Sequence, residues 1–300
     1  MQKLPILALG LAFPAIVFCF CNAQKPAAKP DQNWAIITDS LPYDLANPIL
    51  MLHLADVALK EISGLSPSPV TGQFVSIADE RGELFFLDAS KGGVVTKRVL
   101  FREKGDFEGV EMVDSTIWAI KSDGDLFGIS AWDKPVPIIE SLKTPLKKSD
   151  DVEGLGYDPK RNALLIACKG NSDFFVPRNI FAFDLKTRQM LETPVYSIDP
   201  EEVNRYVPYL ETEKKDAFSP SGVALHPISN EVYVISTALK RLVVLDYTSG
   251  KIKHAQRLDK KILPQPEGIS FDAEGNLFIS CEGKGGDGLL LQFKLKSGKN

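Results

Sequence analysis

The sequence predicts an all-β protein that folds as a five-bladed β-propeller with four-stranded blades of about 45 residues. The first observation behind this prediction is a repeat, because five similar glycine-centred segments have glycine spacings of 45, 45, 68 and 46 residues. The second is that each glycine is followed, after a turn, by two short and nearly continuous apolar runs. A six-bladed ring is the alternative, if residues 31–60 or an insertion contribute a further blade.

The glycine lies in the predicted first strand of each unit. The five segments are Ile62-Ser63-Gly64-Leu65, Phe107-Glu108-Gly109-Val110, Val152-Glu153-Gly154-Leu155, Pro220-Ser221-Gly222-Val223 and Pro266-Glu267-Gly268-Ile269. Glycine at this position is expected because the inner strands of a propeller are crowded, and glycine permits a close backbone approach or a positive φ.

The remaining strands follow the same period. Second strands are predicted at residues 74–77, 117–120, 164–167, 232–235 and 277–280, and third strands at 84–87, 126–129, 180–183, 242–245 and 289–293. Weaker fourth strands are predicted at residues 95–101, 136–140, 195–198 and 252–258. The fifth unit lacks a fourth strand, and residues 49–54 have the length and composition to supply it and to close the ring.

The chain divides into four parts in this interpretation. Residues 1–23, with Lys3 before an apolar run, are predicted to be a signal peptide, so the protein is expected to be periplasmic or secreted. A membrane-spanning helix and a lipoprotein anchored to a membrane through Cys19 or Cys21 are the alternatives. Residues 24–46 are predicted to be a tether, and residues 47–296 a single propeller domain with a charged, partly helical insert near 199–218.

Composition and cysteine content argue against a nucleic-acid-binding protein and against a domain held together by a framework of disulfides. Removal of the signal peptide takes away Lys3 and changes the net charge from −4 to −5, and no basic stripe is present, so nucleic acid is not expected as a partner. Only Cys168 and Cys281 remain after cleavage. They occupy equivalent positions in the third and fifth units, which are not adjacent in a five-membered ring, so free buried thiols are expected.

Equivalent polar positions in successive blades are expected to converge around the channel. The position before each glycine is occupied by Ser63, Glu108, Glu153, Ser221 and Glu267, and the position after each second strand by Asp79, Ser122, Lys169, Thr237 and Glu282. Because the first and second strands are antiparallel neighbours, both sets should lie at the same mouth of the channel. Asp150, Asp151 and Glu111 are expected to add to its negative charge, with ordinary loop charges as the alternative interpretation.

Clustered carboxyl groups either acquire raised pKa values or hold a cation. Carboxylate and carbonyl oxygens favour Ca2+ over a transition metal. Asp79, Lys169 and Glu282 are therefore candidate ligand-binding residues beside a candidate Ca2+ site. The alternative interpretation is that the glutamates cap strand ends, and that Lys169 neutralises Glu153 within the same blade.

The segments Asp106-Phe107-Glu108-Gly109-Val110 and Asp151-Val152-Glu153-Gly154-Leu155 resemble the SdiA-regulated (YjiK-like) bacterial propellers, from about residue 54 to residue 293. The unit from Glu267 to Glu282 is also similar to the β-propeller phytases and, more loosely, to gluconolactonase and NHL-repeat propellers. The resemblance implies a periplasmic or exported propeller, with Ca2+ binding and phytase-like or esterase-like activity suggested for relatives. It also implies that the metal ligands in the channel are Glu108, Glu153, Glu267 and Glu282.

The first functional hypothesis is an exported module that binds Ca2+ and a small ligand or protein at the acidic mouth. The second is a Ca2+-dependent, phytase-like phosphoesterase acting on a phosphorylated substrate, and the third is a metal-dependent lactonase. Ser63 and Ser221 depart from the glutamate pattern in two units. A phosphoesterase also needs basic residues for phosphate, and the candidates near the mouth are Lys169, Lys121, Arg81 and Lys284.

Overall fold

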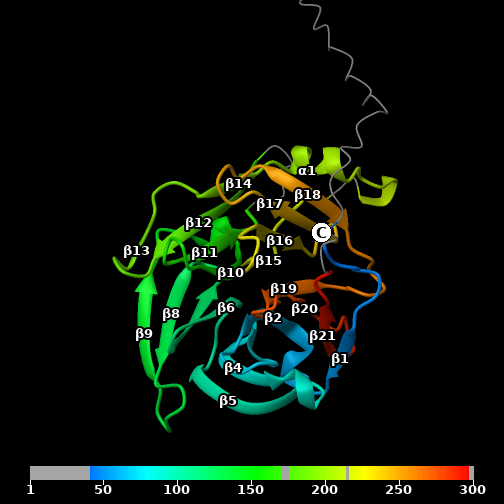
Figure 1. Cartoon of the computed structure of the whole chain (residues 1–300). Coiled ribbons are helices and arrows are strands. Elements are labelled where there is room, and N and C mark those ends of the chain that lie inside the picture. Colours follow the sequence, from blue (N-terminus) through cyan, green and yellow to red (C-terminus); the bar gives the residue numbers. More distant parts are fainter. Residues whose placement is uncertain (1–40, 171–175, 214–215, 297–300) are drawn as a thin grey trace, which may run out of the picture. The chain divides into compact units, whose positions relative to one another are not determined.

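A computed structural model describes residues 41–170, 176–213 and 216–296. It contains five antiparallel sheets arranged as a five-bladed β-propeller, which confirms the predicted fold (Figure 1). The inner strands β2, β6, β10, β15 and β19 contact one another in this order, and β19 returns to β2. Each sheet extends outward from this ring.

The blades follow the chain in sequence order. The first comprises β2 (Ile62–Pro67), β3 (Gln73–Ala78), β4 (Arg81–Asp88) and β5 (Val94–Arg102), and the second β6 (Phe107–Val113), β7 (Thr116–Lys121), β8 (Asp125–Ser130) and β9 (Ile138–Lys143). The third comprises β10 (Val152–Asp158), β11 (Ala163–Cys168), β12 (Arg178–Asp184) and β13 (Gln189–Met190), with β14 (Tyr196–Ile198) also paired to β12. The fourth comprises β15 (Gly222–Leu225), β16 (Val232–Ser236), β17 (Arg241–Leu245) and β18 (Ile252–Arg257).

The fifth blade closes the ring with a strand from the other end of the domain. It comprises β19 (Pro266–Phe271), β20 (Leu277–Cys281), β21 (Gly288–Phe293) and β1 (Leu50–Leu54). The pairing of β1 with β21 is antiparallel and runs from Leu50 opposite Gln292 to Leu54 opposite Gly288. The predicted closure is therefore confirmed, and β1 covers an edge of β21 that would otherwise be open.

Five hydrophobic clusters hold the blades together, one between each pair of neighbouring sheets. The second strands supply much of this core, since every residue of β11, β16 and β20 is buried. A strand covered on both faces needs apolar residues at successive positions and not at alternate ones. This explains the continuous apolar runs in the sequence.

The inner glycines permit the five inner strands to approach one another closely. A Cβ atom at Gly109 would lie 2.8 Å from the Leu155 backbone nitrogen, and one at Gly222 would lie 2.6 Å from the Glu267 carbonyl oxygen. None of the five inner glycines has a positive φ. Close approach, and not an unusual backbone conformation, therefore requires glycine here.

Four short 3₁₀ helices and one α-helix complete the described part of the chain. They are η1 (Val57–Glu61), η2 (Ala89–Lys91), η3 (Lys148–Asp150), α1 (Pro200–Tyr206) and η4 (Glu211–Glu213). Asp199 caps α1, because its side chain accepts a hydrogen bond from the Glu201 nitrogen. Between blades three and four, α1 and η4 occupy the long interval in the repeat, and Glu213 pairs there with Arg241 at 2.8 Å.

The segment before β1 packs on the propeller from residue 41 onward. Leu41, Tyr43 and Leu45 are buried in the cluster between the fourth and fifth blades. The Tyr43 hydroxyl donates to the Gly275 carbonyl oxygen at 2.6 Å and lies 2.8 Å from His226 Nε2. The last residues of the segment assigned to the tether thus contribute to the core.

The predicted signal peptide, Cys19, Cys21 and the first part of the tether lie outside the described residues. Among the residues that are described, no helix is long and apolar enough to cross a membrane.

Candidate functional site at the channel mouth

A β-bulge precedes the glycine in four of the five inner strands. In β6, Phe107 pairs with Lys121 and Gly109 pairs with Ile120, so Glu108 is an extra residue outside the regular ladder. The equivalent extra residues in the other bulged strands are Ser63, Glu153 and Glu267. A bulge redirects the side chain of its extra residue, which places Glu108 and Glu267 in the lining of the channel.

The second set of predicted residues lies at the same end of the sheets. In the first, third and fifth blades, the last residue of the second strand pairs with the residue directly before the bulge. Asp79, Lys169 and Glu282 are the next residues along the chain after those strand ends. The structure therefore brings the two sets of positions to one mouth of the channel, which we call the acidic mouth.

Three glutamates at the acidic mouth influence one another through their charges. Burial and the nearby carboxyl groups of Glu153 and Asp106 raise the pKa of Glu108 to about 9. Burial and the carboxyl groups of Glu282 and Glu153 raise the pKa of Glu267 to about 8. Without a compensating cation, both groups favour the protonated form at neutral pH.

Glu153 differs because it has a basic partner. Lys169 Nζ lies 3.0 Å from Glu153 Oε1 and 3.9 Å from Asp151 Oδ2. Burial raises the pKa of Glu153 only to about 6, since Lys169 opposes the shift. One of the three glutamates is thus neutralised within its own blade, as the alternative interpretation of the sequence proposed.

Asp79 and Glu282 form the side of the mouth between the fifth and first blades. Burial and the neighbouring Glu61 raise the pKa of Asp79 to about 6, and Asp79 Oδ1 is buried without a hydrogen-bond partner among the described residues. The Gln265 side-chain amide donates to Glu282. Asp79 and Glu61 also line an open pocket of about 850 Å3 beside the mouth.

The neutral members of the two sets make local contacts. The Ser122 hydroxyl donates to Asp106, and the hydroxyl groups of Ser221 and Thr237 donate to the Pro266 carbonyl oxygen at 2.6 and 2.7 Å. Ser63 is buried. These residues interrupt the ring of glutamates, which is therefore limited to the second, third and fifth blades.

Two acidic residues of the mouth were not identified as candidates from the sequence. Asp106 contributes to the raised pKa values of Glu108, Glu153 and Asp79, and Glu61 contributes to that of Asp79. The repeated Asp-x-Glu-Gly pattern, which places Asp106 two residues before Glu108, is a signal that could have identified the first of them.

The expectation that Glu111 adds to the acidic mouth is wrong. It lies on β6 beyond Gly109, opposite Trp118 in the ladder, and lines a different pocket.

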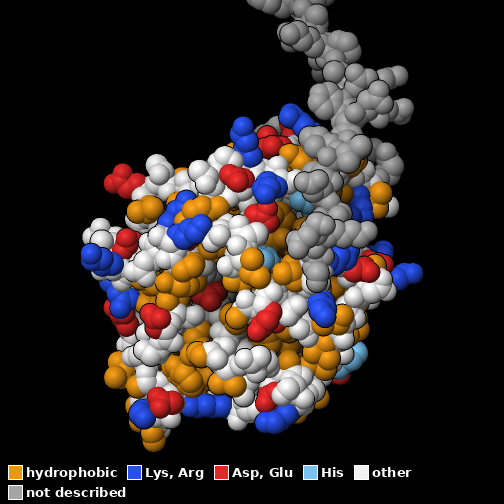
Figure 2. Space-filling view, viewed as in Figure 1, with side chains coloured by type: hydrophobic (Ala, Val, Ile, Leu, Met, Phe, Trp, Pro, Cys, Tyr) orange, Lys and Arg blue, Asp and Glu red, His pale blue; other side chains and the backbone are white. Residues whose placement is uncertain are grey.

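The channel is nearly filled by side chains at the level of the inner glycines. The cavity that remains there is only about 10 Å3, which holds about one water molecule at most. Figure 2 shows one face of the propeller, hollowed where the inner strands meet and edged by hydrophobic side chains with an acidic side chain inside.

Comparison with known proteins identifies the family. A family model described as SdiA-regulated matches residues 52–284, which include all five inner strands. The chain belongs to the SdiA-regulated family. The match confirms the resemblance carried by the repeated Glu-Gly segments. No curated protein sequence matches this SdiA-regulated chain significantly.

Two solved structures illustrate how widely the fold of this SdiA-regulated protein is used. The luciferin-regenerating enzyme has a TM-score of 0.51 and 9% sequence identity, and the match covers 83% of this chain and 95% of that one. Glutaminyl cyclase from Myxococcus xanthus has a TM-score of 0.53 and 14% identity, with coverage of 83% and 96%. At these identities the likeness shows the propeller fold alone.

The donors at the acidic mouth of this SdiA-regulated propeller suit Ca2+ in their chemistry, since they are carboxylate oxygens. Their placement is less suited, because in the described part of the chain no three His, Cys, Asp or Glu residues are close enough together to hold a metal ion. Lys169 also occupies one oxygen of Glu153. An ion at this mouth would have to draw the carboxyl groups together.

Cys168 and Cys281 are free and buried, as expected for core residues. Burial raises the pKa of Cys168 to about 12 and raises the pKa of Cys281 as well. Both thiols therefore stay protonated and unreactive at neutral pH.

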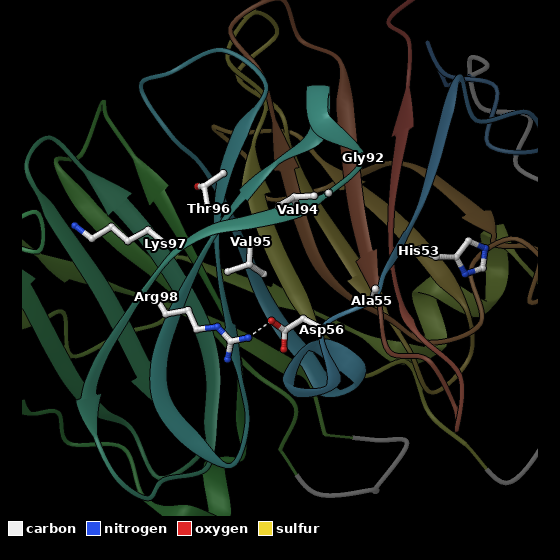
Figure 3. A pocket seen from close by; sticks show the side chains of 10 residues that line it. His53, Ala55, Asp56, Gly92, Val94, Val95, Thr96, Lys97 and Arg98 are labelled. Atoms are coloured by element: carbon white, nitrogen blue, oxygen red, sulfur yellow. Dashed lines mark hydrogen bonds and ion pairs between the residues drawn. The ribbon is translucent and has the colours of Figure 1, made fainter.

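A pocket of about 570 Å3 also lies between β1 and β5 at the periphery of the SdiA-regulated propeller (Figure 3). Arg98 and Asp56 point toward each other across it and form an ion pair. Lys97 donates to the Trp132 carbonyl oxygen at 2.8 Å. The charged groups that line this peripheral pocket already have partners. The acidic mouth is therefore the stronger candidate for a binding site.

Proposed function

We propose that this protein is an exported binding module that takes a cation at the acidic mouth, with Ca2+ as the candidate ion, and that recognises a small ligand or a protein there. The observation that carries the proposal is the concentration of Glu108, Glu153 and Glu267 at one mouth with Lys169 as the basic partner of one of them. Export is proposed from the predicted signal peptide at residues 1–23, with lipid attachment through Cys19 or Cys21 as the alternative.

The raised pKa values of Glu108 and Glu267 support a cationic ligand. Glu108 and Glu267 favour the protonated form at neutral pH because burial and neighbouring carboxyl groups raise their pKa values. A bound cation would favour the ionised form, and protons would leave as it binds. Affinity for Ca2+ should therefore increase as the pH rises from 6 toward about 9.

Three basic side chains near the mouth already pair with acidic residues, which favours a binding module over a phosphoesterase. Lys121 pairs with Asp123 at 2.7 Å, and Arg81 lies 3.2 Å from Glu103. Lys169 pairs with Glu153. A phosphoesterase needs such side chains to hold the charge of its substrate phosphate, whereas these three are engaged by acidic neighbours. Of the four basic candidates, Lys284 contributes only its charge near Glu282.

Thermal unfolding with Ca2+ or EDTA tests the proposal. The protein that begins at Gln24 is compared with the Glu108→Gln/Glu153→Gln/Glu267→Gln variant. The matched control is Glu103→Gln/Glu192→Gln/Glu201→Gln, which makes the same three substitutions at exposed positions.

Ca2+ should raise the Tm of the unmodified protein and of the control, and should leave the Tm of the acidic-mouth variant unchanged. An equal Ca2+ shift in all three proteins would place the ion elsewhere. No shift in the unmodified protein, even at pH 9, would reject the Ca2+ proposal. Hydrolysis of phytate or phosphomonoesters that depends on the three glutamates would instead favour the phosphoesterase.

A further inference from the structure

The channel has a second opening on the other side of the inner glycines. It is a pocket of about 230 Å3, and its lining includes Glu111, Tyr157, Ser270 and Phe271. It adjoins a groove of about 500 Å3 at the same end of the first and fifth blades. The two cavities share Pro67, Met112, Pro227 and Phe271, so we treat them as one site and call it the second mouth.

Glu111 is the central polar group of the second mouth. It is partly buried and lines the pocket. The Ser66 hydroxyl donates to Glu111 Oε1 at 2.8 Å and accepts a hydrogen bond from the Met112 nitrogen at 2.9 Å. Ser66, which is fully buried, thus holds one oxygen of the carboxyl group in place.

The charged side chains that line the second mouth are all acidic. No lysine or arginine lines either cavity, whereas Glu111, Asp114, Asp272 and Glu274 do. His226 is neutral here, since burial lowers its pKa and its Nδ1 accepts hydrogen bonds from the backbone nitrogens of Ile228 and Ser229. A buried carboxyl group with no basic neighbour is costly in its ionised form, and a cationic ligand would remove that cost.

A second polar group in the lining, the Ser270 hydroxyl, lacks a hydrogen-bond partner among the described residues. The Ser270 hydroxyl oxygen is buried and has no hydrogen-bond partner in the part of the chain that the structure describes. Such groups are few in folded proteins and call for an explanation. Ser270 also lines this pocket, beside Glu111.

We propose that the second mouth binds a primary ammonium group on an alkyl chain, with the ammonium on the Glu111 carboxylate and the chain against Met112 and Phe271. Among the described residues no three acidic or other metal-ligating side chains are close enough together to hold a divalent metal ion, and the acidic lining disfavours an anion. The ammonium could belong to a free amine or to a lysine side chain of a peptide, which share this chemistry.

Methionine methyl NMR tests the proposal directly, because Met112 lines the second mouth and only Met51 and Met190 accompany it in the chain that begins at Gln24. The probes are butylammonium, the uncharged butan-1-ol, and Nα-acetyl-lysine N-methylamide. Glu111→Gln is the test variant. Glu192→Gln is the matched control, since it makes the same change at an exposed position that lines neither mouth.

Butylammonium should shift the Met112 signal saturably and leave those of Met51 and Met190 in place. Glu111→Gln should weaken binding at least tenfold, and Glu192→Gln should leave it within about twofold. An unmoved Met112 signal would overturn the proposal, as would equal binding by Glu111→Gln. Equal affinity for butan-1-ol in the unmodified protein would also overturn it, and this comparison does not depend on the folding of a variant. Tighter binding of the lysine derivative would identify a peptide side chain as the source of the ammonium, and tighter binding of butylammonium would identify a free amine.

Discussion

Glu108 and Glu111 lie three residues apart on β6 and face opposite mouths of the channel. Glu108 lines the channel together with Glu267, and Glu111 accepts a hydrogen bond from Ser66 in the other opening. Gly109 lies between them, where the neighbouring inner strand approaches closely. The protein therefore has two acidic openings that can be altered independently.

The acidic mouth should make the stability of the metal-free protein depend on pH. In the folded state the pKa values of Glu108 and Glu267 are about 9 and 8, above the ordinary 4.5. The folded protein therefore retains protons that the unfolded chain releases, so its stability should fall as the pH rises from about 4.5 to 9. Relative to Glu108→Gln/Glu267→Gln, the unmodified protein should lose several kcal/mol between pH 5 and pH 9, because each unit of pKa difference between the folded and unfolded states corresponds to about 1.4 kcal/mol. Urea unfolding at both pH values measures this difference, and parallel pH profiles for the two proteins would contradict it.

Gly109→Ala should destabilise the propeller because the added methyl group would meet the Leu155 backbone. The shortest contact to that backbone would be 2.8 Å, and overpacking of this kind costs about 1–3 kcal/mol. Gly92→Ala is the control, since Gly92 has a φ of 76° but no atom within 4 Å of an added Cβ. It should cost only about 1 kcal/mol for its left-handed conformation. Equal losses for the two variants in urea unfolding would show that close approach is not what requires glycine at position 109.

Removal of β1 should open the ring. A chain that begins after Leu54 lacks the partner of β21 and exposes that strand along its whole length. We expect it to aggregate or to melt at least 10 °C lower, since an open edge strand pairs with other chains. A chain that begins at Leu41 keeps every described element and should behave like the longer protein. Size-exclusion chromatography and thermal unfolding measure both outcomes, and a stable monomer without β1 would show that closure is dispensable.

Glu213 should stabilise the insert through Arg241, whose side chain is 1% exposed. Glu213→Ala would leave this buried cation without its carboxylate and should cost about 3 kcal/mol. Arg257→Ala removes the more exposed partner of Glu213 and should cost about 1 kcal/mol or less. Although burial opposes it, hydrogen bonding to Arg241 and Arg257 lowers the pKa of Glu213 to about 2.

The contribution of Glu213 should therefore be complete above about pH 4.5 and be lost as the pH falls toward 2. Urea unfolding at pH 7 and pH 3 checks both the ranking of the two variants and this loss. A larger effect of Arg257→Ala than of Glu213→Ala would contradict the assignment.

The sequence by itself determined the number of blades, the closing strand and the common position of Glu108, Glu153 and Glu267. Each of these follows from a period of about 45 residues, because equivalent positions in a propeller lie around one axis. Burial of the second strands could also be predicted, since a strand covered on both faces is apolar at successive positions.

Only the tertiary structure decided which charges meet. A bulge at Glu108 and a crowded glycine at position 109 separate Glu111 from the acidic mouth, and neither changes the spacing of residues along the chain. The ion pair between Glu213 and Arg241 connects the insert, which has no counterpart in the other sequence units, to the fourth blade. Such contacts depend on backbone paths and side-chain directions in space, and for that reason sequence periodicity could not predict them.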